Sequence, residues 1–162
     1  MLYHSYYLSP IGWLEILADN QFLCGVNYLE SVENTPNNEN YITRKIVEEL
    51  DNYFSFKNFD FSIALKPINN EFARDIYNTL KNTNVGEVLS YAELSKRSGH
   101  PNAARAVGNA LHNNPFMIVV PCHRVINSDG KLGGFALDLA IKKQLLEYEL
   151  AWLTKGVQSC QI

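Results

Sequence analysis

The spacing of apolar residues changes near the middle of the chain, and this change limits the possible folds more than any other feature. Before residue 66, short segments rich in β-branched and aromatic residues alternate with turns, which is typical of strands. Residues 67–70, Pro-Ile-Asn-Asn, follow as a linker. Beyond them, apolar residues recur every four positions, as in an amphipathic helix, at Phe72, Ile76 and Leu80. The sequence therefore predicts a small α/β (α+β) domain over residues 1–70 and a mostly helical domain over residues 71–162.

The first half is expected to hold a small sheet and one helix. Thr43 can cap a helix that runs to about Phe54, because apolar residues share one stripe along this segment. Residues 59–65 are a further candidate strand. The clearest strands are expected at residues 3–8, 13–18 and 22–28.

Two short helices are expected after Gly86. Ser90 and Glu93 have the spacing of a capping box, and Pro101 prevents the first helix from continuing past residues 98–99. A second helix follows over residues 102–113, so the pair resembles a helix-turn-helix. This second helix carries Arg105 among very small side chains. Such a helix can approach a nucleic-acid backbone closely, or it can pack against another helix and leave Arg105 in water.

A lone cysteine follows an apolar segment and a proline. Residues 117–120 are short, apolar and mostly β-branched, which predicts a buried strand, and Pro121 ends the hydrogen-bond ladder. Cys122, His123 and Arg124 come next. A thiolate is the reactive form of cysteine, and a basic or cationic neighbourhood lowers the thiol pKa from about 8.5. Because adjacent residues on a strand point to opposite faces, the chain must turn at His123 for the pair to cooperate.

The last helix, expected from an Asp138 cap to about Trp152, supplies a candidate partner for His123. Glu149 shares its stripe with Leu145, Leu146 and Trp152. A carboxylate on an apolar stripe either reaches water at the edge or is paired in the interior. In the second case it can orient His123, and a cysteine, histidine and carboxylate suit acyl transfer and alkyl transfer alike.

Composition excludes several classes of protein. The three cysteines of these 162 residues are widely spaced and odd in number, which favours reduced thiols in the cytoplasm over a disulfide framework. No apolar run approaches the roughly 20 residues that span a bilayer, and the N-terminus has no secretory pattern. We therefore expect no membrane association, no metal and no cofactor.

Charge is distributed unevenly between the two halves. The net charge is −3, but residues 1–71 hold four Lys/Arg against ten Asp/Glu, whereas residues 72–162 hold ten against seven. A polyanion would therefore be attracted to the second half.

Several motifs of the second half occur together: Val-Pro-Cys-His-Arg-Val at 120–125, Ala-Ala-Arg-Ala-Val-Gly at 103–108, Asn114-Pro115, Ser90-Tyr91 and Glu149. In this combination the chain resembles the O6-alkylguanine-DNA alkyltransferase family. The resemblance is dense over residues 72–150 and thin over residues 1–70. It implies a ribonuclease-H-like first domain and a protein that binds double-stranded DNA containing alkylated guanine, as a monomer.

The resemblance also implies a role for each matching residue. Cys122 would accept the alkyl group once and irreversibly, and Glu149 would hold His123, which takes the thiol proton through a water. Asn114 would fix the active-site loops, and Tyr91 would bond the departing guanine. The lesion would flip out of the duplex, Arg105 would fill the gap, and the helix would enter the minor groove. DNA binding is assigned to Ser90, Tyr91, Ala103, Ala104, Arg105, Ala106 and Gly108, and the alkylguanine pocket to Met117, Val125, Phe135, Ala136 and Leu137.

Two departures from the family pattern lie in the expected pocket. Leu137-Asp138 stands where the family commonly has two glycines, and Phe135 where it often has tyrosine. These residues predict a narrower pocket that accepts methyl better than benzyl adducts, or Asp138 simply caps the last helix.

Three other functions are weighed against this one. A lesion-binding relative without transfer would lack Cys122, and a sequence-specific regulator would need more bidentate side chains than the alanine-rich helix offers. A Cys-His hydrolase would turn over many substrates, whereas thioether formation occurs once per molecule.

Overall fold

The computed structural model describes residues 1–34, 36–132 and 139–160, with side chains up to Lys155 in the last range. The chain forms two compact units. The first unit comprises Met1–Pro67 and Pro115–Val119, and the second comprises Ile68–Asn114 and Val120–Ile162. In the described residues no helix is long and apolar enough to cross a membrane.

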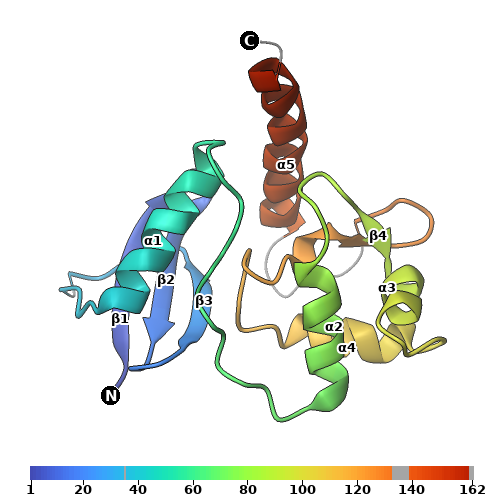
Figure 1. Ribbon diagram of the computed structural model, residues 1–162, viewed down its shortest axis with the longest axis horizontal. Coiled ribbons are helices and arrows are strands. Elements are labelled where there is room, and N and C mark those ends of the chain that lie inside the picture. Colours follow the sequence, from blue (N-terminus) through green and yellow to red (C-terminus); the bar gives the residue numbers. More distant parts are fainter. Residues whose placement is uncertain (35, 133–138, 161–162) are drawn as a thin grey trace. The chain divides into compact units, whose positions relative to one another are not determined.

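The first unit is an antiparallel sheet covered by one helix. Strands β1 (Tyr3–Ser9), β2 (Gly12–Ala18) and β3 (Leu23–Leu29) pair in that order, and α1 (Tyr41–Phe54) lies across β1 and β2 (Figure 1). Alternation along the strands turns one face toward the helix. The three expected strands and the helix are confirmed. The core between sheet and helix includes Leu14, Ile16, Ile46 and Leu50, all fully buried.

Helix α1 begins earlier than the sequence predicts. Its cap is Asn40, whose side chain accepts from the Thr43 backbone N–H at 3.0 Å. The Thr43 hydroxyl accepts in return from the Asn40 N–H at 3.0 Å, so Thr43 is the reciprocal member of the capping box. Both residue types can cap a helix, and the prediction of Thr43 as the cap was wrong by three positions.

The candidate strand at residues 59–65 is absent, and only Leu65 forms a bridge, to Leu23. A side chain takes over part of the hydrogen bonding that a neighbouring strand would supply. The buried Glu49 carboxylate of α1 accepts from the backbone N–H of Ser62 at 2.8 Å and from its hydroxyl at 3.2 Å.

The segment before the cysteine is buried but is not a strand. Phe116 forms a parallel bridge to Val26 of β3, and the Val26 N–H donates to Pro115 O at 2.9 Å. Ile118 then has φ of +72° and the chain turns, which ends any ladder. The prediction of a strand at 117–120 was therefore wrong, although the prediction of burial was right.

The second unit is mostly helical. It contains α2 (Glu71–Lys81), α3 (Tyr91–Arg97), α4 (Ala104–His112) and α5 (Leu139–Cys160). Helices α2, α3 and α4 contact one another, and α5 contacts the 3₁₀ turn Cys122–Arg124, called η1 (Figure 1). Two short strands, β4 (Leu89–Ser90) and β5 (Val125–Ile126), pair in parallel. The expected fold class, a small sheet domain followed by a helical one, is confirmed.

The α3–α4 pair forms as predicted. The Ser90 hydroxyl accepts from the Glu93 N–H at 3.0 Å, so the expected capping box is present. Gly99 has φ of +86°, which glycine adopts at little cost, and α3 has ended before it. Helix α4 starts at Ala104 rather than at Asn102, because Asn102 has φ of +62° and belongs to the turn.

Candidate active site

The chain turns at the cysteine, as cooperation between Cys122 and His123 requires. In η1 the Cys122 N–H donates to Val120 O at 2.8 Å, and the Arg124 N–H donates to Pro121 O at 3.0 Å. Strand β5 then pairs beside Ser90, the residue before α3. Cys122, His123 and Arg124 are all buried, and His123 is completely so.

Glu149 is the partner of His123. Helix α5 buries Ile141, Leu145 and Glu149 along one face, and Glu149 is 1% exposed. Its Oε2 lies 2.6 Å from His123 Nε2. The interpretation of Glu149 as a solvated edge residue is therefore wrong. Because a carboxylate only accepts, the Nε2–H of His123 is the donor, and Nδ1 is the other ring nitrogen. Among the described residues, Nδ1 has no hydrogen-bond partner.

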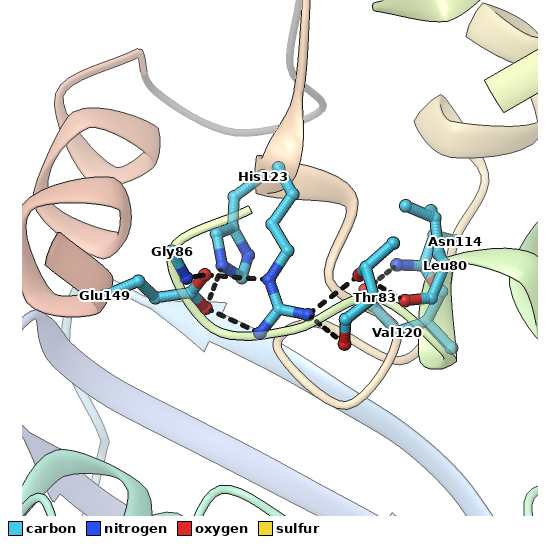
Figure 2. A network of polar contacts seen from close by, with 8 residues as sticks. Leu80, Thr83, Gly86, Asn114, Val120, His123 and Glu149 are labelled. Atoms are coloured by element: carbon cyan, nitrogen blue, oxygen red, sulfur yellow. Dashed lines mark hydrogen bonds and ion pairs between the residues drawn. The ribbon is translucent and has the colours of Figure 1, made fainter. Parts of the chain in front are cut away.

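Arg124 completes this network, and the sequence analysis gave it no role. Its Nε donates to Glu149 Oε1 at 2.7 Å and its Nη2 donates to Oε2 at 3.1 Å. Its Nη1 donates to the carbonyl and the hydroxyl of Thr83 at 3.0 and 2.8 Å. Figure 2 shows this network between Glu149 and Gly86 at one end and Thr83 at the other. A buried acid on α5 requires a nearby cation, and that requirement could have pointed to Arg124.

The network keeps Glu149 ionised in the interior. Burial by itself raises the pKa of this carboxyl. Its interactions with His123 and Arg124, including hydrogen bonds from both residues, outweigh burial, so the pKa of Glu149 lies well below its usual range. The Gly86 N–H adds a longer contact to Oε1, at 3.4 Å.

The thiol of Cys122 is less acidic than the sequence suggests. Burial raises the pKa of Cys122, and the opposing effects of the Asn114 hydrogen bond and the Lys142 charge are smaller. The expectation of a lowered thiol pKa is wrong for the resting protein, in which a proton must leave the sulfur before it can attack.

Asn114 bonds across the segment Pro115–Val119, which belongs to the first unit although the residues on both sides of it belong to the second. The second unit stops at Asn114 and resumes at Val120. The Asn114 Nδ2 donates to Val120 O at 2.9 Å, across this break. Since Asn114 also bonds the Cys122 side chain, it positions both the loop and the thiol.

Lys142 is a second buried cation that the sequence analysis missed. It lies on α5, is fully buried, and donates through Nζ to Val125 O at 2.6 Å and to Leu132 O. Burial lowers the pKa of Lys142 to about 8, although the nearby Cys122 opposes this shift. A lysine amid a helical pattern gives no sequence signal for such a position, because most lysines are exposed.

Burial and the charge of Cys122 raise the pKa of two tyrosines, Tyr91 and Tyr77. Tyr91, the first residue of α3, is half-buried, and burial and Cys122 both raise its pKa. Tyr77 of α2 donates to Ala110 O at 2.6 Å, and burial raises its pKa to about 12. Both hydroxyls therefore stay protonated and act as hydrogen-bond donors at neutral pH.

The small-residue surface of α4 faces outward. Ala104, Arg105 and Ala106 are exposed, and a Cβ added at the half-buried Gly108 would meet no atom within 4 Å. The alternative in which these alanines pack against another helix is therefore wrong. Ala103 is the N-cap residue of α4 and is half-buried, whereas Ser90 is buried and caps α3.

Two of the predicted pocket residues, Val125 and Met117, lie among the described residues. Val125 is fully buried in β5, three residues from Cys122. Met117 is buried and belongs to the first unit. Phe135, Ala136, Leu137 and Asp138 lie outside the described residues, so the narrower pocket and the Asp138 cap stay predictions.

Two family models together match most of the chain. The model of the 6-O-methylguanine DNA methyltransferase ribonuclease-like domain matches residues 2–67. The model of the 6-O-methylguanine DNA methyltransferase DNA binding domain matches residues 71–151.

Individual relatives and solved structures agree with these matches. The methylated-DNA–protein-cysteine methyltransferase of Methanosarcina acetivorans is 38% identical over 91% of this chain and 98% of its own. The protein of the same name from Haemophilus influenzae is 35% identical over 98% and 92%. The crystal structure of Mycobacterium tuberculosis OGT in complex with DNA superposes with a TM-score of 0.82, at 33% identity, over 92% of this chain and 93% of that one.

Proposed function

This chain belongs to the 6-O-methylguanine DNA methyltransferase family, and we propose that Cys122 is the acceptor of the alkyl group. The reaction is repair of damaged DNA by direct transfer to a protein cysteine, as in the relatives named methylated-DNA–protein-cysteine methyltransferase. One observation carries the assignment to Cys122. The buried sulfur is followed by a histidine whose Nε2 is held by a buried carboxylate at 2.6 Å.

The proposed step is an in-line displacement at the alkyl carbon of O6-alkylguanine. The thiol proton moves from Sγ to His123 Nδ1, directly or through a water, and the sulfur electron pair forms the S–C bond. The C–O6 bond breaks and its electron pair stays on the guanine oxygen. Glu149 stabilises the imidazolium that forms, in the way that a carboxylate orients a general base.

Tyr91 suits the leaving group. Negative charge develops on guanine as the C–O6 bond breaks, and a donor aimed at that charge lowers the barrier. Because burial and Cys122 raise the pKa of the Tyr91 phenol, it keeps its proton and can donate. The resulting thioether has no good leaving group for water to displace, so each molecule acts once.

Helix α4 is the proposed DNA-binding element. Its exposed face combines Arg105 with Ala104 and Ala106, so the helix backbone can approach DNA closely. A buried thiol cannot reach a base inside a duplex, so the alkylated nucleotide flips out, at a cost of a few kcal/mol. Arg105 then fills the gap from the minor groove, and phosphate attraction to the basic second half supplies most of the affinity.

The other predictions from the sequence complete the proposal. We propose a monomer that works in the cytoplasm on double-stranded DNA, with O6-alkylguanine and O4-methylthymine as substrates. A multiple-turnover hydrolase is the rival, since it would use the same Cys-His pair. The two differ in the fate of the alkyl group, which either stays on the protein or is released to water.

The test follows a labelled methyl group. The protein is incubated with a duplex that carries one O6-[³H-methyl]guanine, and label on protein is counted per molecule. We expect one label per molecule, on the peptide that contains Cys122. Cys122→Ala should abolish transfer while duplex binding survives, and Cys24→Ala, at the half-buried cysteine of β3, should leave transfer intact. Label released to water over many turnovers, or transfer by Cys122→Ala, would contradict the proposal.

A further inference from the structure

Arg124 holds a fixed positive charge against the carboxylate that orients His123. Its side chain is 6% exposed, and its Nε and Nη2 bond the two oxygens of Glu149 at 2.7 and 3.1 Å. Its Nη1 is anchored on Thr83, whose hydroxyl donates in turn to Leu80 O at 2.6 Å. The planar guanidinium is therefore immobilised at both ends, an arrangement that a flexible ammonium group cannot reproduce.

The charges of this buried group balance only when His123 is neutral. With Arg124 positive and Glu149 negative, the sum with a neutral imidazole is zero. Without the charge of Arg124, Glu149 and a neutral His123 would leave one net negative charge in the interior, which is strongly unfavourable. The pair would then bind one more proton, and Nδ1 is the basic atom that would take it.

We infer that Arg124 is a positioning residue that keeps His123 Nδ1 unprotonated in the resting protein, so that it can accept the Cys122 proton at neutral pH. This inference rests on the proposed function of Cys122 and His123. The proton that leaves Sγ becomes the Nδ1–H, and the electron pair stays on sulfur for the S–C bond. The low pKa of Glu149, to which the Arg124 hydrogen bond contributes, agrees with an ionised carboxylate before transfer.

Other titratable groups face the same region, and none of them replaces Arg124 in this balance. Lys142 of α5 acts on Cys122, and its amine donates to Val125 O and Leu132 O. A hydrogen bond from Arg97 lowers the pKa of Glu87 and the charge of Arg124 adds to this effect, but the carboxylate of Glu87 is paired with Arg97, whose Nη1 lies 2.6 Å from its Oε2. Burial and Cys122 raise the pKa of Tyr77 of α2 and of Tyr91 of α3, so both hydroxyls are neutral. The hydrogen bonds of Arg124 reach both Glu149 oxygens, at 2.7 and 3.1 Å.

The experiment is the pH dependence of single-turnover methyl transfer at saturating duplex. Arg124→Gln removes the charge. Arg124→Lys keeps the charge but loses the planar guanidinium that bonds both Glu149 oxygens. Arg97→Gln is the matched control at an exposed ion pair. We expect Arg124→Gln to lose roughly 100-fold at neutral pH, within the range of a general base, and to recover as pH rises. The half-maximal pH should move upward in Arg124→Gln, less in Arg124→Lys, and not at all in Arg97→Gln.

A double variant separates charge balance from structural damage. Arg124→Gln with Glu149→Gln removes both charges, so nothing drives His123 to bind the extra proton. The double variant should transfer slowly but without the upward shift. If Arg124→Gln does not fold, the double variant still tests the inference, because it leaves no unpaired buried charge and its half-maximal pH can be measured. An unshifted Arg124→Gln with a uniformly lower rate, or a shifted double variant, would overturn the inference.

Failure of the inference and failure of the proposed function give different results. If the unmodified protein transfers no methyl group to Cys122, the proposed function is wrong. If the unmodified protein transfers normally and the half-maximal pH is the same in Arg124→Gln, only the inference is wrong.

Discussion

Two arginine–glutamate pairs of the second unit have nearly the same geometry and very different surroundings. Arg124 and Glu149 approach to 2.7 Å, and their side chains are 6% and 1% exposed. Arg97 and Glu87 approach to 2.6 Å, with exposures of 48% and 28%. The first pair joins η1 to α5, and the second joins α3 to the segment before β4.

Distance alone therefore does not indicate what an ion pair does. In water, two charges at this separation attract weakly and are screened by salt. In the interior the attraction is larger, but each charge has lost its hydration, so the net stabilisation by the pair is small while the loss of one partner is costly. The buried pair is thus suited to fixing a protonation state, and the exposed pair is nearly neutral for folding.

The comparison predicts the largest effect where a buried partner is removed. Arg124→Ala leaves Glu149 buried without the guanidinium that compensates its charge, so we expect a loss of about 3–5 kcal/mol in the free energy of unfolding. Urea denaturation monitored by tryptophan fluorescence measures this loss. A loss under 1 kcal/mol would mean that water reaches the carboxylate and that the pair is not truly buried.

A buried cation bonded to backbone carbonyls should behave differently from one bonded to a carboxylate. The pKa of Lys142 is about 8 in the folded protein and 10.5 ordinarily. Between these values the unfolded chain binds a proton that the folded protein does not, so this group makes stability rise with pH, by up to about 3 kcal/mol. Lys142→Met should remove that rise from the stability curve measured between pH 8 and 10.5.

The exposed neighbour Lys143 provides the matched control for Lys142. Lys143→Met should leave the curve parallel to that of the unmodified protein. Cys122, Tyr77 and Tyr91 titrate nearby with the opposite sign. Lys142→Met also removes the charge that holds down the pKa of Cys122, and this change lowers the stability curve further in the same direction. Parallel curves for Lys142→Met and the unmodified protein would show that Lys142 is not desolvated.

The exposed pair should show the smallest effect. Arg97→Ala removes the partner of Glu87, and water replaces it, so we expect a change of about 0.2–1 kcal/mol that shrinks as salt is added. The same urea titrations in low and high salt check this. A loss as large as that of Arg124→Ala would remove the distinction between the two pairs.

The sequence predicted the elements whose signals are local. The strands at residues 3–8, 13–18 and 22–28, the Ser90 capping box and the α3–α4 pair follow from patterns within about ten residues, and these are present. The error at Thr43 arose because Asn40, also a capping residue, lies three positions earlier. Burial at 117–120 was predictable from composition, but the turn at Ile118 depends on pairing with β3, which is distant in sequence.

Within the candidate site, a pattern could predict the members but not the network. Cys122, His123 and Glu149 were named because a histidine follows the cysteine and a carboxylate lies on an apolar stripe. Arg124 and Lys142 went without roles because charged residues are usually solvated, and only three-dimensional burial marks the exceptions. The upward shift of the Cys122 pKa likewise depends on desolvation, which a sequence does not report.

The protonation state of His123 in the unmodified protein tests the account most directly. Histidine labelled with ¹⁵N, with the His123 signals identified by their absence in His123→Gln, reports which ring nitrogens carry protons in the free protein at neutral pH. We predict a neutral imidazole protonated at Nε2, with Nδ1 free to accept a proton. A cationic ring protonated on both nitrogens before DNA is added would contradict the account.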